Sequence, residues 1–284
     1  MKQLSTYVQE KLIINQRFDE KLIINKDYRD TKIAEPKTFD ELRQIIEDRY
    51  DKLGPGTEQY PVDFNDINTS NITSFDGLFK HLKFKYIDIS LWDTIQVESM
   101  AQMFYDCNKL ISIGNIGKWD VCNVESFSIM FSNCKCLENI GDLSSWNVSN
   151  VKTFKGMFFN CNVLESIGDL TDWKVTDKLK DTFGMFNSCY KLKNIGDIGK
   201  WEMRNVSTMC SMFSMCNELE YIGDISSWDL RSVVSMSSIF RGCYKLTNIG
   251  NLSKWKKPKG LSYSNCSHAF LGSSIKNTPK WMLK

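Results

Sequence analysis

The stretch WDVCNVESFSIMFSNCKCLENIGD, residues 119–142, decides the fold, because close variants of it recur along most of the chain. Its tryptophan recurs every 27 residues, with one step of 28, at Trp92, Trp119, Trp146, Trp173, Trp201, Trp228 and Trp255. A cysteine column keeps the same spacing at Cys107, Cys134, Cys161, Cys189, Cys216 and Cys243. Columns in register over this length indicate six full tandem units, which favours a solenoid over a compact domain.

Within one unit the apolar residues divide into two groups. Met100, Met103, Phe104 and Cys107 lie at i, i+3, i+4 and i+7, the spacing of one face of a short helix. Residues 110–116 are short and interrupted by Gly114, which predicts a strand and a turn. One such unit cannot enclose a core alone, whereas stacked units bury a continuous one. The predicted class is therefore α/β, a solenoid of short strands, turns and short helices.

The chain divides into three predicted regions. Residues 1–35 form a polar tail in which EKLIIN occurs twice, at 10–15 and 20–25. Residues 36–61 form a capping helix and linker, since Thr38 and Glu41 have capping-box spacing and an apolar stripe ends before Gly54. Residues 62–284 form the solenoid, with degenerate end units. The extra residue before Leu179 predicts a local bulge.

Composition excludes several classes of function. The 36 Lys and Arg nearly balance 34 Asp and Glu, which argues against a nucleic-acid binder. Only His81 and His268 are available for a catalytic triad or a histidine metal site, and pairing Cys266 with His268 lacks an orienting third group. We therefore expect no catalytic residue, no bound metal and no cofactor. No apolar run suggests a membrane span or a secretory signal, so a cytoplasmic or virion-associated location is favoured over classical secretion.

Three further patterns leave alternatives open. The column cysteines lie on an apolar face, which favours buried reduced thiols over a disulfide stack or a zinc site. Aspartates follow the repeat glycines at Asp142, Asp169, Asp197 and Asp224, which favours turn formation over a cation-binding ladder. Residues 251–284 contain seven lysines and no acidic residue, which is typical of a solvated end cap and also suits an anionic partner.

The Met-Phe-x-x-Cys-x-x-Leu core and the Ile-Gly-Asp turn resemble the BspA-like leucine-rich repeat, also called the bacterial surface-protein or Mycoplasma-type repeat. The resemblance covers residues 63–281, and segments 36–42 and 66–72 are similar to the form found in gut Bacteroidetes and their crAss-like phages. It implies a leucine-rich-repeat solenoid that binds proteins or host surfaces without enzymatic activity. Residues 1–10 are similar to phage capsid-targeting peptides that are cleaved after a glutamate, which implies an alternative as a virion structural or packaged cargo protein.

We therefore predict a non-catalytic binding module. The partner is expected to be a protein or a surface glycan, and the chain is expected to be monomeric in isolation. The candidate binding column immediately precedes the repeat tryptophans and varies from unit to unit: Lys118, Ser145, Asp172, Lys200, Ser227 and Lys254.

Overall fold

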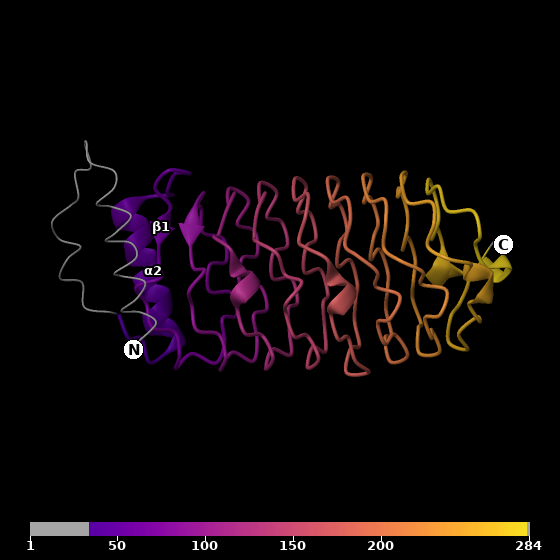
Figure 1. Cartoon of the computed structure of the whole chain (residues 1–284), viewed down its shortest axis with the longest axis horizontal. Coiled ribbons are helices and arrows are strands. Elements are labelled where there is room, and N and C mark those ends of the chain that lie inside the picture. The colour runs from indigo at the N-terminus through magenta and orange to yellow at the C-terminus, as the bar shows by residue number, and fades with distance from the viewer. Residues whose placement is uncertain (1–33, 283–284) are drawn as a thin grey trace. The chain divides into compact units, whose positions relative to one another are not determined.

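A computed structural model describes residues 34–282 of the chain. Helix α2 (Phe39–Leu53) comes first, followed by two short strands, β1 (Val62–Asp63) and β2 (Ile87–Asp88), and then by a row of irregular coils (Figure 1). Five one-turn 3-10 helices punctuate the coils: η2 (Ile116–Lys118), η3 (Leu170–Asp172), η4 (Leu252–Lys254), η5 (Ser264–Cys266) and η6 (Lys280–Met282). The predicted tail, apart from Ala34 and Glu35, lies outside the described residues.

Parallel bridges join equivalent residues of successive units. Strands β1 and β2 pair in parallel, with Val62 opposite Ile87. One column of single bridges follows the solenoid through Ser74, Ser99, Ser126, Thr153, Asp181, Thr208 and Ser235, and a second column includes Tyr86, Ser112 and Asn139. Each unit is therefore one coil, and the coils stack in register as a repeat solenoid.

The short helices predicted in each unit are wrong. The segments equivalent to residues 126–134 are successive tight turns, because Ile129 and Asn133 have φ values of 62° and 64°. A left-handed residue every fourth position breaks the helical hydrogen-bond pattern. The freed N–H groups donate to the next coil instead, as Phe131 N does to Met157 O at 2.8 Å. The apolar residues of the segment share one buried face, as expected. They are carried by successive turns, however, and not by a helix.

The core consists of side-chain ladders that run from coil to coil. The phenylalanine rings stack with centroids 5.0–5.7 Å apart along Phe79, Phe104, Phe131, Phe158, Phe186, Phe213, Phe240 and Phe270. The tryptophan Nε1 atoms donate to carbonyls of the preceding coil at 2.8–3.2 Å, from Trp92, Trp119, Trp146, Trp173, Trp228 and Trp255. Each coil therefore buries its apolar residues and its indole donor against its neighbour.

Helix α2 packs against the first coil. Thr38 Oγ1 accepts a hydrogen bond from Glu41 N, which satisfies one of the free donors at the helix start. Leu42 and Ile46 are buried in the core. Arg49 reaches across to the Asp66 carboxylate at 2.6 Å. The apolar stripe predicted after Thr38 thus joins the helix to the solenoid.

One tryptophan near the bulge predicted before Leu179 lacks the ladder hydrogen bond. The extra residue falls between Trp173 and Trp201, and Trp201 Nε1 is buried without a hydrogen-bond partner. Thr182 replaces the Phe or Met found at this position in neighbouring coils, and the Phe154 ring contacts both Trp173 and Trp201, with centroids 5.5 and 6.2 Å away. The aromatic core thus stays continuous while one indole donor is unsatisfied.

This difference predicts that Trp173→Phe and Trp201→Phe lower the free energy of unfolding by different amounts. Both indoles are 3% exposed, but only Trp173 donates a hydrogen bond, to Leu143 O at 2.8 Å. We expect Trp173→Phe to lower the free energy of unfolding by about 1–2 kcal/mol more than Trp201→Phe, because the second change removes a donor that is already unsatisfied. Urea denaturation of both variants measures the difference, and equal losses would contradict the assignment.

Candidate functional site

The cysteine column is structural. All ten cysteines lie within the described residues and are free thiols. Each column thiol donates to a phenylalanine carbonyl of the preceding coil, with Sγ to O distances of 2.9–3.2 Å. Burial raises the pKa of Cys107 and of Cys243 to about 12, which leaves the neutral thiol as the stable form. Buried reduced thiols are therefore the interpretation that the contacts support.

Cys266 and His268 are not arranged as a nucleophile and a base. Cys266 Sγ donates to the carbonyl of Tyr263 at 3.2 Å, and burial raises the pKa of this thiol. His268 is exposed, and no contact joins it to Cys266 within residues 34–282. The pair therefore lacks the hydrogen bond that would activate a thiol.

The aspartate column forms turns. Asp142, Asp169, Asp197 and Asp224 each accept a hydrogen bond on Oδ1 from the N–H two residues later, at 2.9 Å. The hydrogen bonds from the Thr171 hydroxyl and backbone lower the pKa of Asp169, and those from Ser226 lower the pKa of Asp224. Within residues 34–282 no group of three His, Cys, Asp or Glu side chains could hold a metal ion. These carboxylates fix the local backbone.

The candidate binding column lies on the surface, and its members differ in their contacts. All six residues are exposed: Lys118, Ser145, Asp172, Lys200, Ser227 and Lys254. Ser145 Oγ donates to Gly117 O at 2.8 Å, and Ser227 Oγ donates to Gly199 O at 3.3 Å. No hydrogen bond or ion pair within the described part of the chain engages the Lys118, Lys200 or Lys254 ammonium groups. The column therefore combines two hydrogen-bonded hydroxyls with three lysine ammonium groups that have no such partner.

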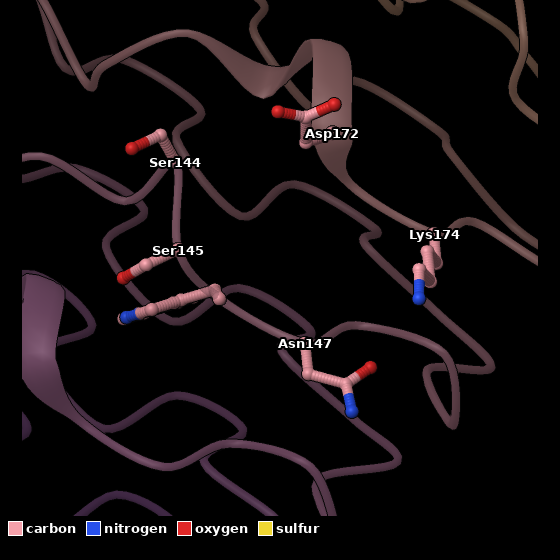
Figure 2. Close-up of a pocket in the computed structure, with 6 residues that line it drawn as sticks. Ser144, Ser145, Asn147, Asp172 and Lys174 are labelled. Atoms are coloured by element: carbon pink, nitrogen blue, oxygen red, sulfur yellow. The ribbon is translucent and has the colours of Figure 1, made fainter.

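Two adjacent members of the column meet in an open depression of about 450 Å³. Ser145 and Asn147 line it from one coil, and Asp172 and Lys174 line it from the next (Figure 2). The remaining lining residues are Ser144 and Trp146. The depression combines hydroxyl, amide, carboxylate and ammonium groups, which together donate and accept hydrogen bonds. Lys118, Lys200, Ser227 and Lys254 do not line it.

Asn147 and Lys174 were missed by the sequence analysis. Both directly follow a repeat tryptophan, at a position that also varies between units, as with Asp120 and Glu202. Since Trp146 and Trp173 are buried and the residues on either side of each are exposed, both flanking columns border the same surface there. The residue that follows each tryptophan varies from unit to unit, and this variation was the sequence signal that could have identified them.

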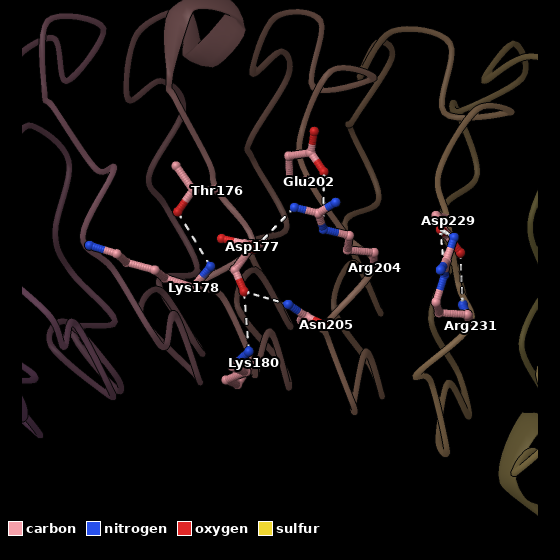
Figure 3. Close-up of polar contacts among 9 residues, drawn as sticks. All are labelled: Thr176, Asp177, Lys178, Lys180, Glu202, Arg204, Asn205, Asp229 and Arg231. Carbon is pink, nitrogen blue, oxygen red and sulfur yellow. Dashed lines mark hydrogen bonds and ion pairs between the residues drawn. The ribbon is translucent and has the colours of Figure 1, made fainter.

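Polar contacts continue along the solenoid beside the bulge. Asp177 is central, because its carboxylate accepts from Arg204 Nη2 at 3.0 Å and its carbonyl accepts from Asn205 Nδ2 at 2.8 Å (Figure 3). Lys180 Nζ also donates to that carbonyl, at 3.1 Å. Lys178 Nζ donates to Asn150 Oδ1. These bonds join three successive coils where the extra residue interrupts the repeat.

A second open groove, of about 840 Å³, lies along three coils. It is lined by Glu138, Asn139, Gly141, Asp142, Val163, Glu165, Ser166, Gly168 and Lys191. The Glu165 carboxylate pairs with Lys193 at 2.6 Å, and this ion pair lowers the pKa of Glu165. Of its lining residues the sequence analysis considered Asp142 alone, as a member of the aspartate column, because the groove exists only once the coils are stacked.

These features define the chain as a repeat solenoid with polar lateral depressions. Residues 73–196 and 180–277 match the family described as Mycoplasma protein of unknown function, DUF285, and the chain belongs to this family. The match confirms the predicted Mycoplasma-type repeat, and it indicates no enzymatic family. No curated protein matches the chain. Within residues 34–282 no helix has the length and apolar character needed to cross a bilayer.

Solved structures of leucine-rich repeat proteins also show some similarity. One from Eubacterium ventriosum is 15% identical with a TM-score of 0.33, and the alignment covers 78% of this chain and 82% of that one. A leucine rich cell surface protein from Faecalibacterium prausnitzii is 18% identical with a TM-score of 0.29, covering 73% of this chain. The chain spans 44% of the length of that second structure.

Proposed function

We propose that the protein is a non-catalytic binding module whose lateral surface, on either side of the buried tryptophans, recognises a partner protein on a host or cell surface. The observation that carries the proposal is the depression that Ser145, Asn147, Asp172 and Lys174 form between two coils. The core columns hold the coils in register, so residues that vary between units are presented side by side. Such a surface can be changed residue by residue without altering the fold.

The chemistry of the depression supports recognition over turnover. Asp172 is its one carboxylate, so a pair of carboxylates for acid and base catalysis is lacking there. Asp172 and Lys174 lie on the same coil and carry opposite charges. A protein surface that presents a complementary charge pair beside hydrogen-bonding groups would bind here with a defined orientation. A surface glycan is the other partner class that the hydroxyl and amide groups suit.

A charge swap tests the proposed surface. The variant Asp172→Lys with Lys174→Glu keeps the net charge and reverses the local polarity. We expect it to reduce saturable binding to a surface-protein extract of the native source at least tenfold, because both complementary contacts become repulsive. The bound proteins are identified by mass spectrometry and then assayed individually in purified form.

The matched control is Glu165→Lys with Lys193→Glu, which reverses an exposed ion pair beside the second groove, of which Glu165 is a lining residue. We expect this variant to bind like the wild type. Equal loss in both swaps, or wild-type retention by the first swap, would contradict recognition through the depression. Absence of saturable wild-type binding would contradict the function itself.

The alternative as a virion structural or packaged cargo protein depends on residues 1–10, which lie outside the described residues. No contact within residues 34–282 favours it over surface binding.

A further inference from the structure

The coil that carries the extra residue concentrates positive charge on its outer side. Lys174, Lys178 and Lys180 are all exposed, and Leu179 is buried between the last two. None of the other five full units has a basic residue at the first or second of these positions, and only one has a basic residue at the third. The three lysines are therefore specific to this coil and are not part of the repeat pattern.

Lys178 occupies a position that other coils use for a structural hydrogen bond. Asparagines at this position donate from Nδ2 to a carbonyl of the preceding coil at 2.6–2.8 Å, as in Asn123, Asn150 and Asn205. In the coil with the extra residue the equivalent carbonyl, Ser149 O, accepts from Thr176 Oγ1 at 2.9 Å instead. The side chain at position 178 is therefore not needed for this bond between coils, and a lysine can occupy the position.

Within the described residues, neither Lys178 nor Lys180 is neutralised by a carboxylate. Lys178 Nζ donates to Asn150 Oδ1, and Lys180 Nζ donates to Asp177 O at 3.1 Å (Figure 3). Both acceptors are uncharged oxygens, one in a side-chain amide and one in a backbone carbonyl. An ammonium group has three donors, so each lysine keeps its charge and has donors left for a ligand.

The carboxylates near these lysines have other partners. The Asp177 carboxylate pairs with Arg204 of the following coil at 3.0 Å, and Arg204 Nε also lies 3.8 Å from the Glu202 carboxylate. Asp181 Oδ1 accepts a hydrogen bond from Phe183 N at 2.8 Å. The two lysine charges are therefore unpaired on a surface that also carries fixed negative charges.

We propose that Lys178 and Lys180 bind an acidic segment of the partner protein. Lys174, on the same coil, lines the lateral depression, so a partner that fills the depression would bring an adjoining part of its surface over the two lysines. The inference therefore deepens the proposed function and rests on it. Carboxylates of the segment would replace the neutral oxygens that Lys178 and Lys180 contact, and hydrogen bonds between charged groups are stronger than those to neutral acceptors.

The mixed charges around the two lysines favour a protein segment over a densely charged polymer. Asp177 and Glu202 are exposed on the same surface. A polymer such as polyphosphate would place further negative charge against both of them, which is unfavourable. A protein segment has its carboxylates at separate positions, so it can pair with the lysines and present uncharged residues to the acids.

Titration of the purified chain with a 12-residue peptide of alternating Glu and Ser tests the proposal. We expect saturable binding that Lys178→Gln with Lys180→Gln weakens about fivefold or more, because two charge contacts are lost. Lys178→Arg with Lys180→Arg keeps both charges and should bind like the wild type. The control pair Lys109→Gln with Lys135→Gln removes the same charge from two other exposed lysines and should also bind like the wild type. Equal weakening by both Gln pairs, or no saturable binding to the wild type, would overturn the proposal.

Lysine methyl signals locate the bound peptide. Dimethylation of the lysines keeps their charge and gives each a separate NMR signal. The signals of Lys178 and Lys180 should shift when the peptide is added, and those of Lys109 and Lys135 should not. Shifts of similar size at all four would overturn the proposal. Tripolyphosphate that shifts the first two signals at a lower concentration than the peptide does would overturn the assignment to a protein segment.

The partner assay distinguishes failure of this inference from failure of the proposed function. Lys178→Gln with Lys180→Gln should weaken binding of the surface protein about fivefold or more. If that variant binds the partner like the wild type, while the charge swap at Asp172 and Lys174 loses it, this inference is overturned and the proposed function stands. Absence of any saturable surface partner contradicts the proposed function, and that result comes from the extract assay, which the peptide titration does not use.

Discussion

Replacing Gly168 by alanine is expected to lower the free energy of unfolding by about 3–5 kcal/mol, although the change adds one methyl group. Gly168 has φ +90°, and an added Cβ would lie 1.8 Å from Oδ1 of Asp142 in the preceding coil. The carboxylate would have to move and give up its hydrogen bond to Ser144 N. Chemical denaturation measures the loss.

Gly77→Ala is the matched control for this change. Gly77 also has a positive φ, +68°, but the nearest atom to its added Cβ is Lys80 Cδ at 3.7 Å. We expect only the backbone cost of about 1–2 kcal/mol there. If the two alanine variants lose the same stability, the close approach of aspartate to glycine has no energetic role.

Replacing Phe158 by alanine should cost about 4 kcal/mol. Phe158 is fully buried, and its ring stacks on Phe131 and Phe186 with centroids 5.5 and 5.7 Å away. The substitution removes a large apolar side chain and interrupts the ring ladder on both sides, so neither neighbouring coil can close the cavity without losing its own register.

Phe183→Ala provides the comparison, because it removes the same side chain from the next coil at a site that is 39% exposed. We expect a loss below about 1 kcal/mol, including the contact of Lys155 with its ring. Thermal and urea unfolding of both variants measure the difference. A small effect at Phe158 would show that the solenoid does not depend on a continuous ring ladder.

The sequence was enough to identify the array and its buried columns. Trp146, Phe131, Cys134 and Leu137 repeat at fixed intervals and are all buried. A strict period forces equivalent residues into equivalent environments, so the repeat itself predicts burial.

The backbone of the turn segments could not be deduced from apolar spacing alone. Residues at i, i+3, i+4 and i+7 share one face of a helix, and they also share one face of two successive tight turns. The signal that separates these possibilities is glycine at turn positions: Gly156, Gly184 and Gly242 all have positive φ where other coils carry Ile129 or Met215. Glycine tolerates this conformation, whereas it weakens a helix.

The exposed columns of the surface could be predicted from the sequence, but the cavities between the coils could not. Ser145 and Asp172 were predicted to lie on the surface because they belong to a column that varies from unit to unit, and both are exposed. The depression also needs Asn147 and Lys174, and it depends on how two coils meet. The missing hydrogen bond of Trp201 Nε1, in the coil that follows the inserted residue, is likewise visible only in the structure.

Presentation of any binding surface depends on coil register. Stability in a solenoid comes mainly from contacts between neighbouring coils, so a shift of one coil would move every surface column beyond it. The aspartate of one coil and the glycine of the next meet repeatedly: an added Cβ at Gly141, Gly168, Gly196, Gly223 or Gly250 would lie 1.7–1.9 Å from an Asx Oδ1. This close approach therefore recurs from one coil to the next at the turn.

A double-mutant cycle between Asp142 and Gly168 tests this account most directly. Asp142→Ala alone should cost about 1 kcal/mol, the value of a lost turn hydrogen bond. In the Asp142→Ala background, the clash with Oδ1 is absent, so Gly168→Ala should cost at least about 1–2 kcal/mol less than in the wild type. A coupling of this size supports the close approach of the Asp142 carboxylate to Gly168 of the next coil, and with it the register in which the two coils are stacked. Additive costs would contradict it.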